Sequence, residues 1–571
     1  MRLVEWFALV VGLSTCTCVY IGLAFAGLDG PTVPTVSKPT TLKVNLTSLL
    51  GYHDTALTHV LFIIQNDYDA VIETISTHWV KFPPCHPQEQ DEVCQPSNNL
   101  SPKLILASAL PLPMINLPRC FSSVSICQVE LGNELEGIWN RACFTPGELV
   151  GFVLVMEPSM RPVKENWLSI LQRSLAFPNP NLLLSPSITS KLIPGVTFTL
   201  DWNNAIYNFA RQPVPGLAQI ATMYQASFHD FDKFKSDNYN ILRWQFLHLI
   251  RVNPFLAHSL ELCTHSTLFC KSCDNLPIPT TVVDIKKSLT HVIIAFHNSN
   301  ASINKLRETV NVWWKHFPPC IANTKHWQCT GGALPHLVFL RMVDYKETKD
   351  MGQDQAEFFA NTFPNHTLDT CFASHTLCTL RLNQSESTYM TGSRITFESF
   401  LTRHHPLGDC PETIMAGAEY GMYMESDLKP VKHAWLTTLQ YRVRYSAPFN
   451  ILGSVFRGQD AYSRTLPSNR HRYHINSNAV YDLTTFPAIY FTQIRPFIVE
   501  RTRMGEETAM DLDIFHYLLD NRKDLVPRAK LLTQIQYTNL ISNKYRDNWQ
   551  VAEFASKRIP TLLVHGGNVN K

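Results

Sequence analysis

The sequence predicts an α/β protein made of two tandem domains, each built on a mostly parallel sheet. Apolar runs with the composition of strands, such as 291–296 and 337–340, alternate with helical segments such as 302–314. Such alternation is typical of α/β units. The second observation is a repeat, because residues 156–168 match residues 424–436 without a gap. A repeat of this kind indicates a duplicated domain of about 250 residues per copy, which is an ordinary domain size.

The chain begins with an apolar segment. Residues 6–28 contain no charged side chain, and crossing a bilayer takes about 20 apolar residues. We therefore expect a signal anchor in residues 1–30 and a single-pass type II protein whose folded part lies in the lumen of the Golgi or ER. A cleaved signal peptide, which would give a secreted protein, is the alternative. Residues 31–56 begin rich in proline, threonine and serine and read as a stem.

Several features of the remaining chain indicate an oxidising lumen. Sequons occur at Asn45, Asn99, Asn300, Asn365 and Asn383, and each is a potential glycosylation site. Thirteen of the 15 cysteines follow the apolar segment, because Cys16 and Cys18 lie within it. Cysteines in a secretory context indicate disulfides. We predict four short bridges, namely Cys85–Cys94, Cys120–Cys127, Cys320–Cys329 and Cys371–Cys378.

The other cysteines after the anchor are Cys143, Cys263, Cys270, Cys273 and Cys410, and the sequence leaves their partners open. Cys270 and Cys273 have the spacing of a zinc pair but stand alone, so a structural role is preferred. The predicted N-terminal domain spans 57–274, the linker 275–288 contains Pro277 and Pro279, and the C-terminal domain spans 289–571. With 49 basic and 47 acidic residues, the chain gives no electrostatic reason to expect a nucleic acid partner.

Residues 420–436 are the stretch most suggestive of chemistry. An apolar strand ends in Glu425-Ser426-Asp427, a turn is expected at Lys429-Pro430, and a helix containing Trp435 follows. Ligands of open α/β sheets bind at the carboxyl ends of strands, and Mg²⁺ or Mn²⁺ is commonly held there by carboxylates. The alternative is a strand end with two solvated acids.

Together with Gly453-Ser454, Arg457-Gly458 and the run HINSNAVY at 474–481, this stretch resembles nucleotide-sugar-dependent glycosyltransferases of the GT-A fold. The resemblance implies transfer of a sugar from a nucleotide-sugar donor to a glycan, glycoprotein or lipid acceptor, assisted by Mn²⁺ or Mg²⁺. It implies that Asp427 binds the metal. Glu425 departs from the Asp-x-Asp pattern of that family, so its expected place is near the ribose or, through water, near the metal.

The same resemblance implies roles for further residues. His565 ends an apolar run near the C-terminus and would be a third metal ligand, with a surface histidine as the alternative. Asp511 and Asp513 are candidates for a catalytic base or an acceptor-orienting carboxylate. Because Asp230 and Asp232 repeat that pair in the first copy, a structural role is the alternative. Donor or acceptor binding is expected from Gly453, Ser454, Arg457, His474, Asn476 and Asn478.

The duplication allows the copies to be compared. Shared pairs are Glu157/Glu425, Asn204/Asn478, Tyr207/Tyr481 and Asp232/Asp513. By contrast, Asp427 is matched by Ser159, Gly453 by Leu184, Arg457 by Ile188, His474 by Leu200 and Asn476 by Trp202. Each difference removes a polar or permissive residue from the first copy, so we predict that this copy is inactive and that the second is catalytic. The alternative is a non-catalytic carbohydrate-binding or scaffold protein of the secretory pathway.

Overall fold

A computed structural model describes part of the chain. The described residues are 57–64, 68–85, 102–108, 120–128, 143–144, 151–176, 184–189, 199–208, 256–257, 267–271, 287–320, 333–345, 355–363, 370–402, 408–446, 448–455, 474–506, 508–519, 525–545, 549–554 and 561–566. No helix within these ranges is both long and apolar enough to span a bilayer. The predicted anchor and stem, Asp230, Asp232 and Arg457 lie outside them, as do the sequons at Asn45, Asn99 and Asn365.

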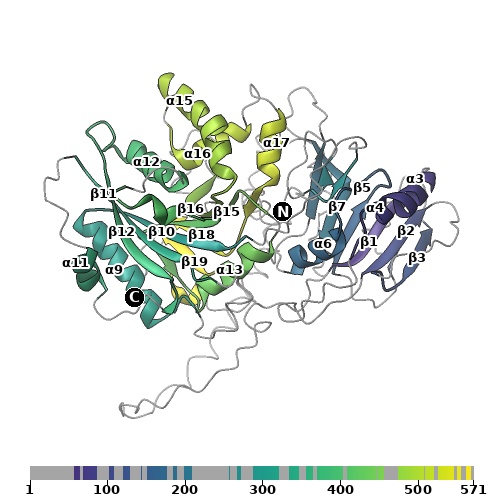
Figure 1. Cartoon of the computed structure of the whole chain (residues 1–571), viewed down its shortest axis with the longest axis horizontal. Helices are drawn as coiled ribbons and strands as arrows, with labels where there is room; N and C mark the ends of the chain where they lie inside the picture. Colours follow the sequence, from purple (N-terminus) through teal and green to yellow (C-terminus); the bar gives the residue numbers. More distant parts are fainter. Residues whose placement is uncertain are drawn as a thin grey trace, which may run out of the picture. The chain divides into compact units, whose positions relative to one another are not determined.

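Figure 1 shows the described elements of the first half. They are β1 (Leu57–Ile64), α3 (Tyr68–Glu73), a π-helical turn (Thr74–His78), α4 (Trp79–Lys81), β2 (Lys103–Ser108), β3 (Val124–Gln128), β4 (Phe152–Met156), β5 (Arg161–Pro162), α6 (Trp167–Ala176), β6 (Leu184–Thr189), β7 (Thr199–Asn208), β8 (Leu256–Ala257) and β9 (Phe269–Cys270).

The described elements of the second half repeat this pattern and extend it. They are β10 (Leu289–His297), α9 (Asn300–Lys315), β11 (His336–Val343), α11 (Gln355–Thr362), β12 (Ser374–Arg381), α12 (Tyr389–Leu401), β13 (Tyr420–Glu425), β14 (Leu428–Pro430), α13 (Trp435–Tyr445), β15 (Ile451–Val455), β16 (Ile475–Asp482), α14 (Phe486–Ile489), α15 (Arg495–Arg503), α16 (Met510–Leu519), α17 (Leu525–Thr533), β17 (Ile535–Tyr537), β18 (Ile541–Tyr545) and β19 (Leu563–Gly566). Single turns lie at Glu412–Met415, Tyr490–Ile494 and Val551–Phe554.

Both large sheets have the same strand order. It is β3-β2-β1-β4-β7-β6 in the first half and β12-β11-β10-β13-β16-β15 in the second. The first four strands of each series are parallel, and the next two are antiparallel to their neighbours. The predicted α/β class with mostly parallel sheets is therefore confirmed. The prediction of a turn at Lys429-Pro430 is wrong, because these residues form part of β14 and pair with β19.

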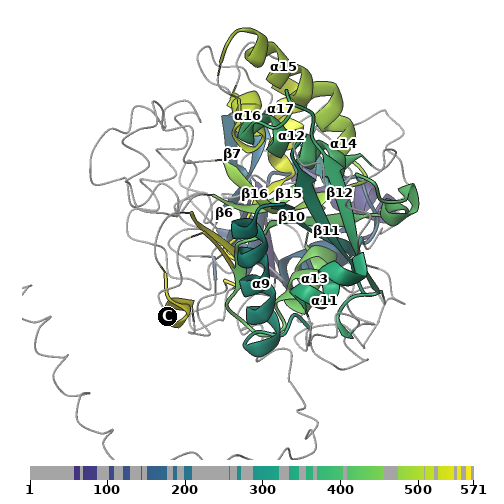
Figure 2. The same ribbon diagram turned by 90° about the vertical axis from the view of Figure 1, so that its left-hand side faces the viewer.

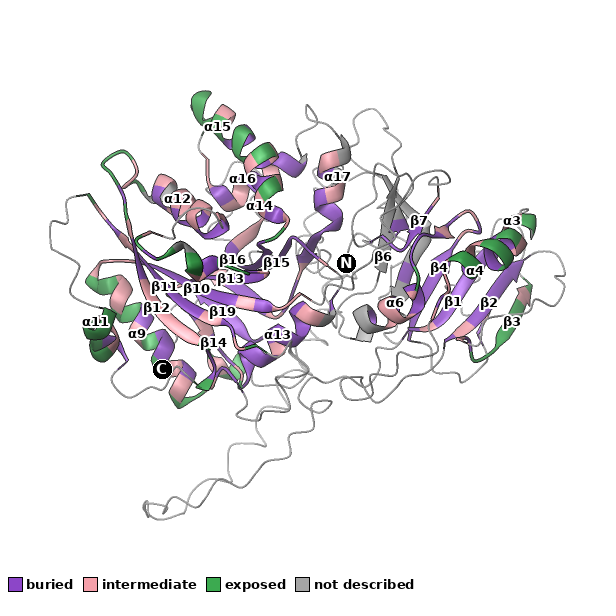
Figure 3. Ribbon diagram, viewed as in Figure 1, coloured by how far each residue is buried: buried purple, intermediate pink, exposed green. Residues whose placement is uncertain are grey.

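The second half has three layers, because the central strands β10 and β13 of its sheet bury both faces. Along β10, Val292, Ile294 and Phe296 face a cluster that contains Trp313 of α9 and Trp435 of α13. Ile293 and Ala295 belong to a second cluster, which contains residues of α12, α14 and α16. Alternation of this kind follows from the two-residue period of a strand. Figure 1 and Figure 2 show these helices on opposite sides of the sheet, and Figure 3 shows the central strands buried and the outer helices partly exposed.

Contacts around the strand ends also recur in both halves. Thr74 donates a hydrogen bond to the carbonyl of Pro158, as Thr309 does to that of Ser426. The Trp79–Trp167 ring pair is mirrored by Trp313–Trp435.

The backbone shows the same correspondence. The two described non-glycine residues with positive φ, Asn166 and Ala434, each donate a backbone hydrogen bond to the first proline carbonyl of a Phe-Pro-Pro segment. The halves therefore share local geometry as well as strand order.

The four predicted disulfides are wrong. Instead of Cys85–Cys94, Cys120–Cys127, Cys320–Cys329 and Cys371–Cys378, the structure has Cys85–Cys120, Cys127–Cys143, Cys320–Cys371 and Cys378–Cys410, with Cα atoms 5.1–6.1 Å apart. Cys127 and Cys378 lie within β3 and β12, and their predicted partners precede these strands. A strand advances about 3.3 Å per residue, which places seven-residue pairs too far apart for a bridge. Cys270 is disulfide-bonded as well, which agrees with a structural role.

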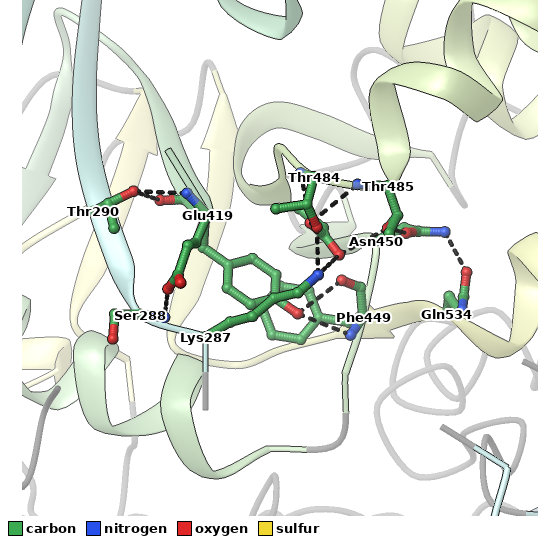
Figure 4. Close-up of polar contacts among 11 residues, drawn as sticks. Lys287, Ser288, Thr290, Glu419, Phe449, Asn450, Thr484, Thr485 and Gln534 are labelled. Carbon is green, nitrogen blue, oxygen red and sulfur yellow. Dashed lines mark hydrogen bonds and ion pairs between the residues drawn. The ribbon is translucent and has the colours of Figure 1, made fainter. Parts of the chain in front are cut away.

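A buried polar network closes the end of the second sheet that lies opposite Glu425 (Figure 4). Lys287 Nζ lies 2.6 Å from Asp482 Oδ2, and the side chains are 11% and 0% exposed. Thr484 and Thr485 donate hydrogen bonds to the same carboxylate. Figure 4 also shows Glu419 bound to the backbone amide of Ser288 and Asn450 bound to Gln534. The network fixes the start of β10 and the end of β16.

We expect Lys287→Met to destabilise the protein by about 3–5 kcal/mol, because it leaves the Asp482 carboxylate buried without its cation. Urea denaturation measures this change. Lys429→Met is the matched control. The Lys429 side chain is 13% exposed, but its partner Glu308 is 67% exposed, so the carboxylate left without its cation is solvated and the loss should be about 0–1 kcal/mol. Equal losses in the two variants would contradict the assignment.

The same pair predicts a pH dependence. Burial raises the pKa of Asp482, but Lys287 and the threonine hydroxyls lower it to a value below its ordinary one. A depressed carboxyl pKa stabilises the fold above the unfolded value of about 3.9 and loses that contribution as the pH falls below it. Asp482→Asn should therefore show a smaller loss of stability below about pH 4 than the parent.

Candidate metal centre

Three predicted ligands are brought together at the carboxyl end of β13, beside a separate small sheet of order β14-β19-β18. β13 carries Glu425, the following two residues lead into β14, and β19 carries His565. The register of β14 against β19 places His565 opposite Leu428, one residue after Asp427. His565 Nε2 lies 2.8 Å from Glu425 Oε2 and 3.3 Å from Asp427 Oδ1. One potential ligand atom from each residue falls within 4.8 Å of the others.

A second layer of side chains orients these groups. His565 Nδ1 lies 3.0 Å from Asn543 Oδ1, and a hydrogen bond from Nδ1 to this amide oxygen leaves Nε2 directed at the carboxylates. Ser477 Oγ donates to Glu425 Oε1 at 2.6 Å. The Asn478 amide oxygen accepts from the backbone N–H of Glu425 at 2.7 Å. Such outer contacts are typical of metal ligands, whose orientation they fix.

The loop between the two acids is held by α9. This helix begins after Ser299, whose side chain accepts a hydrogen bond from the backbone N–H of Ser302. One turn further along, Lys305 Nζ lies 3.3 Å from Asp427 Oδ2. Thr309 Oγ1 donates to the carbonyl of Ser426 at 2.7 Å. The position of Asp427 therefore depends on a helix that is more than 100 residues away in sequence.

Electrostatics links the three groups. Burial alone would lower the pKa of His565, but the two carboxylates raise it to about 10. Burial raises the pKa values of Glu425 and Asp427, yet His565 lowers both below their ordinary values, with help from Lys305 at Asp427. Without a metal ion, two carboxylates therefore share one imidazolium. Two carboxylate oxygens and one imidazole nitrogen are a donor set that suits Mn²⁺ and accommodates Mg²⁺ less well.

Asp511 and Asp513, the two candidate catalytic acids, occupy different environments on α16. His474 Nε2 lies 3.7 Å from Asp511 Oδ2. Burial raises the pKa of Asp511, the neighbouring His474 opposes that rise, and the negative charge of Glu425 adds to it. Asp511 is thus electrostatically linked to the metal ligands.

The other candidate, Asp513, belongs to the interior. Its side chain is 0% exposed and pairs with Arg501 at 3.6 Å and with His516 at 3.2 Å. These contacts give Asp513 a structural part in packing α15 against α16.

The other predicted binding residues have varied surroundings. Asn476 Oδ1 accepts from the side chain of Asn478, which in turn fixes Glu425. Ser454 is buried. Gly453 has a packing role, since a Cβ there would lie 2.2 Å from Ile475 Cγ2.

The register also corrects the residue matched with Gly453 in the first half. Gly453 lies opposite Ala479 and Pro186 lies opposite Ala205. Ala205 and Ala479 occupy corresponding places in the shared Asn-Ala-x-Tyr segment. Gly453 is therefore matched by Pro186, and the match with Leu184 is wrong by two residues.

Three residues of the site were missed by sequence reasoning. Ser477 lies between Asn476 and Asn478, and this run of polar residues is the sequence signal that indicates it. Lys305 and Asn543 reach the site only because α9 and β18 pack beside it. We find no sequence signal that identifies these two.

Two solved glycosyltransferase structures align with the chain at low similarity. The apo form of mouse xyloside xylosyltransferase 1 aligns with 48% of this chain and 97% of its own, at 11% identity and a TM-score of 0.27. The apo structure of the bifunctional glycosyltransferase WbbM aligns with 90% of this chain and 94% of its own, at 8% identity and a TM-score of 0.25. At TM-scores this low, the alignments establish neither a fold nor a function for this chain. No protein-family model matches the sequence, and no curated protein matches it.

Proposed function

We propose that the second half is a glycosyltransferase domain that moves a sugar from a nucleotide-sugar donor to a glycan, glycoprotein or lipid acceptor. The proposal rests on one observation, which is that Glu425, Asp427 and His565 lie together at the carboxyl end of β13. The residues fit a divalent cation, Mn²⁺ or Mg²⁺, by their donor atoms, by the negative charge of two carboxylates and by the fixed imidazole orientation. When bound, such a cation supplies positive charge that neutralises a departing diphosphate.

The chain's own residues then have distinct tasks. Asp427 and His565 hold the cation, and Glu425 is held by Ser477 and Asn478 where it meets the cation or a ribose hydroxyl. Asp511 receives a proton or orients the acceptor hydroxyl, and His474 lies beside its carboxylate. The polar side chains of residues 474–478 bind hydroxyl groups of the donor sugar or of the acceptor. We assign Asp513 and Gly453 to the fold.

The proposal extends to the whole chain. The matching strand orders and contacts support a tandem duplication with an N-terminal domain at 57–274 and a C-terminal domain at 289–571. The disulfides and the exposed sequon residues Asn300 and Asn383 support a luminal protein, anchored in the Golgi or ER membrane by residues 1–30.

A direct test uses the purified full-length chain with a panel of nucleotide-sugars. Release of nucleotide is measured with Mn²⁺, with Mg²⁺ and after chelation. We expect one donor to be hydrolysed or transferred only when a cation is present. A chain that binds no nucleotide-sugar from the panel under any of these conditions would contradict the proposed function.

Cation binding should release a proton. A histidine must be neutral to bind a metal. The two carboxylates, however, raise the pKa of His565 to about 10 and thus favour its protonated form at neutral pH. Mn²⁺ affinity should therefore rise with pH. Calorimetric titrations in buffers of different ionisation enthalpy measure the released protons. No proton release at pH 7 would show that His565 is not a ligand.

A further inference from the structure

The first half contains a counterpart of the candidate metal centre in which a lysine takes the place of the histidine. In β5 and β9, Arg161 lies opposite Cys270. In β14 and β19, Lys429 lies opposite Val564. Arg161 and Lys429 are matched residues of the repeat, so Cys270 corresponds to Val564. The next residues, Lys271 and His565, therefore correspond as well.

The contacts of the two residues match this register. Lys271 Nζ lies 2.7 Å from Glu157 Oε2, and His565 Nε2 lies 2.8 Å from Glu425 Oε2. Ser159, which corresponds to Asp427, donates to the same Glu157 oxygen at 3.4 Å. The surrounding frame is also kept, since Arg161 pairs with Glu73 as Lys429 pairs with Glu308.

The two sites differ in charge and in ligand atoms. The second-half site offers two carboxylates and an imidazole. The first-half site offers one carboxylate, a neutral hydroxyl and an ammonium group. A lysine ammonium has three donors and no lone pair, so it cannot coordinate a cation, and its single charge already neutralises Glu157. The side chains of Lys271 and Glu157 are 36% and 24% exposed, so the pair is within reach of solvent.

We propose that the ammonium group of Lys271, at the place of the His565 imidazole, supplies in the first half the positive charge that a divalent cation supplies in the second. The chain then binds one divalent cation, and the first half keeps its strand-end geometry without any. This inference rests on the proposed function for its account of the second half only. It further assigns the loss of metal binding to two residues, Lys271 and Ser159, and so predicts that restoring their counterparts creates a second cation site.

Equilibrium dialysis with Mn²⁺ tests the proposal on the full-length chain. The parent should bind one ion, and the double variant Lys271→His/Ser159→Asp should bind two. The control Lys103→His/Ser125→Asp introduces the same residue types on β2 and β3 and should bind one. Two ions on the parent, or no additional ion on a folded double variant, would overturn the proposal. If the parent binds none and the double variant one, the inference stands and the metal centre of the second half is refuted.

A second measurement needs neither metal binding nor a folded Lys271→His/Ser159→Asp variant. Lys271→Gln should lower the thermal midpoint in the presence of a chelator, because Glu157 loses its cation. Adding Glu157→Gln to that variant should restore most of the loss. Independent, additive effects of the two substitutions would show that Lys271 does not neutralise Glu157 and would overturn the proposal.

Discussion

Asp427→Asn should lower sugar transfer by about 10²–10³-fold, which is the usual effect of removing one preorganised electrostatic contact. Asparagine keeps the size of the side chain and one oxygen but removes the negative charge. Both Mn²⁺ affinity and turnover should fall, because the cation loses an anionic ligand. The fold should persist, since Asp427 lies between β13 and β14 and its neighbours Ser426 and Leu428 remain anchored. Mn²⁺ dialysis, nucleotide-sugar turnover and thermal melting measure the three effects.

Ser159→Ala is the matched control in the first half. Ser159 corresponds to Asp427 and donates only a 3.4 Å hydrogen bond to Glu157. Its removal should leave Mn²⁺ binding and turnover unchanged. If Asp427→Asn transfers sugar at the parental rate, the metal assignment is wrong. If Ser159→Ala abolishes transfer, the catalytic half has been chosen incorrectly.

The fold was predictable from the sequence because its signals are local and repeated. Runs such as 291–296 have the composition of buried strands, and the repeat of 156–168 in 424–436 placed Glu157 and Glu425 at matching strand ends. The antiparallel position of β16 beside β13 was not predictable, because a buried strand has the same composition in either direction. The predicted disulfide pairs were wrong for a related reason. Cysteines pair with partners that are close in space, whereas the sequence shows only how far apart they are along the chain.

The candidate site was predictable only in part. Glu425 and Asp427 share one short segment, so their proximity follows from the strand end. His565 was placed with them by resemblance, and its contact depends on β14 pairing with β19. Lys305, Asn543 and Lys271 come from distant segments, and only tertiary packing brings them to Asp427, His565 and Glu157, respectively.

Asp511→Asn should lower kcat by about 10²–10⁴-fold, the usual contribution of a positioned general base, while leaving Mn²⁺ affinity near the parental value. The amide cannot accept the acceptor proton, yet it keeps the shape of the side chain beside His474. Because burial raises the pKa of Asp511 above its ordinary value, the parental rate should rise with pH in a range above about pH 4. This limb of the profile should disappear in the variant.

Asp513→Asn should lower stability and leave kcat unchanged, which is the reverse of the result expected for Asp511→Asn. Asp513 is fully buried against Arg501 and His516, whereas Arg501 has a second partner in Glu506 at 2.9 Å. Loss of the charged contacts of Asp513 should therefore destabilise the fold by about 1–3 kcal/mol. At a temperature where the variant is folded, its kcat should equal that of the parent. Stopped assays of transfer and urea denaturation separate the two effects. A large fall in kcat for Asp513→Asn with normal stability, together with full activity of Asp511→Asn, would exchange the roles assigned to these two carboxylates.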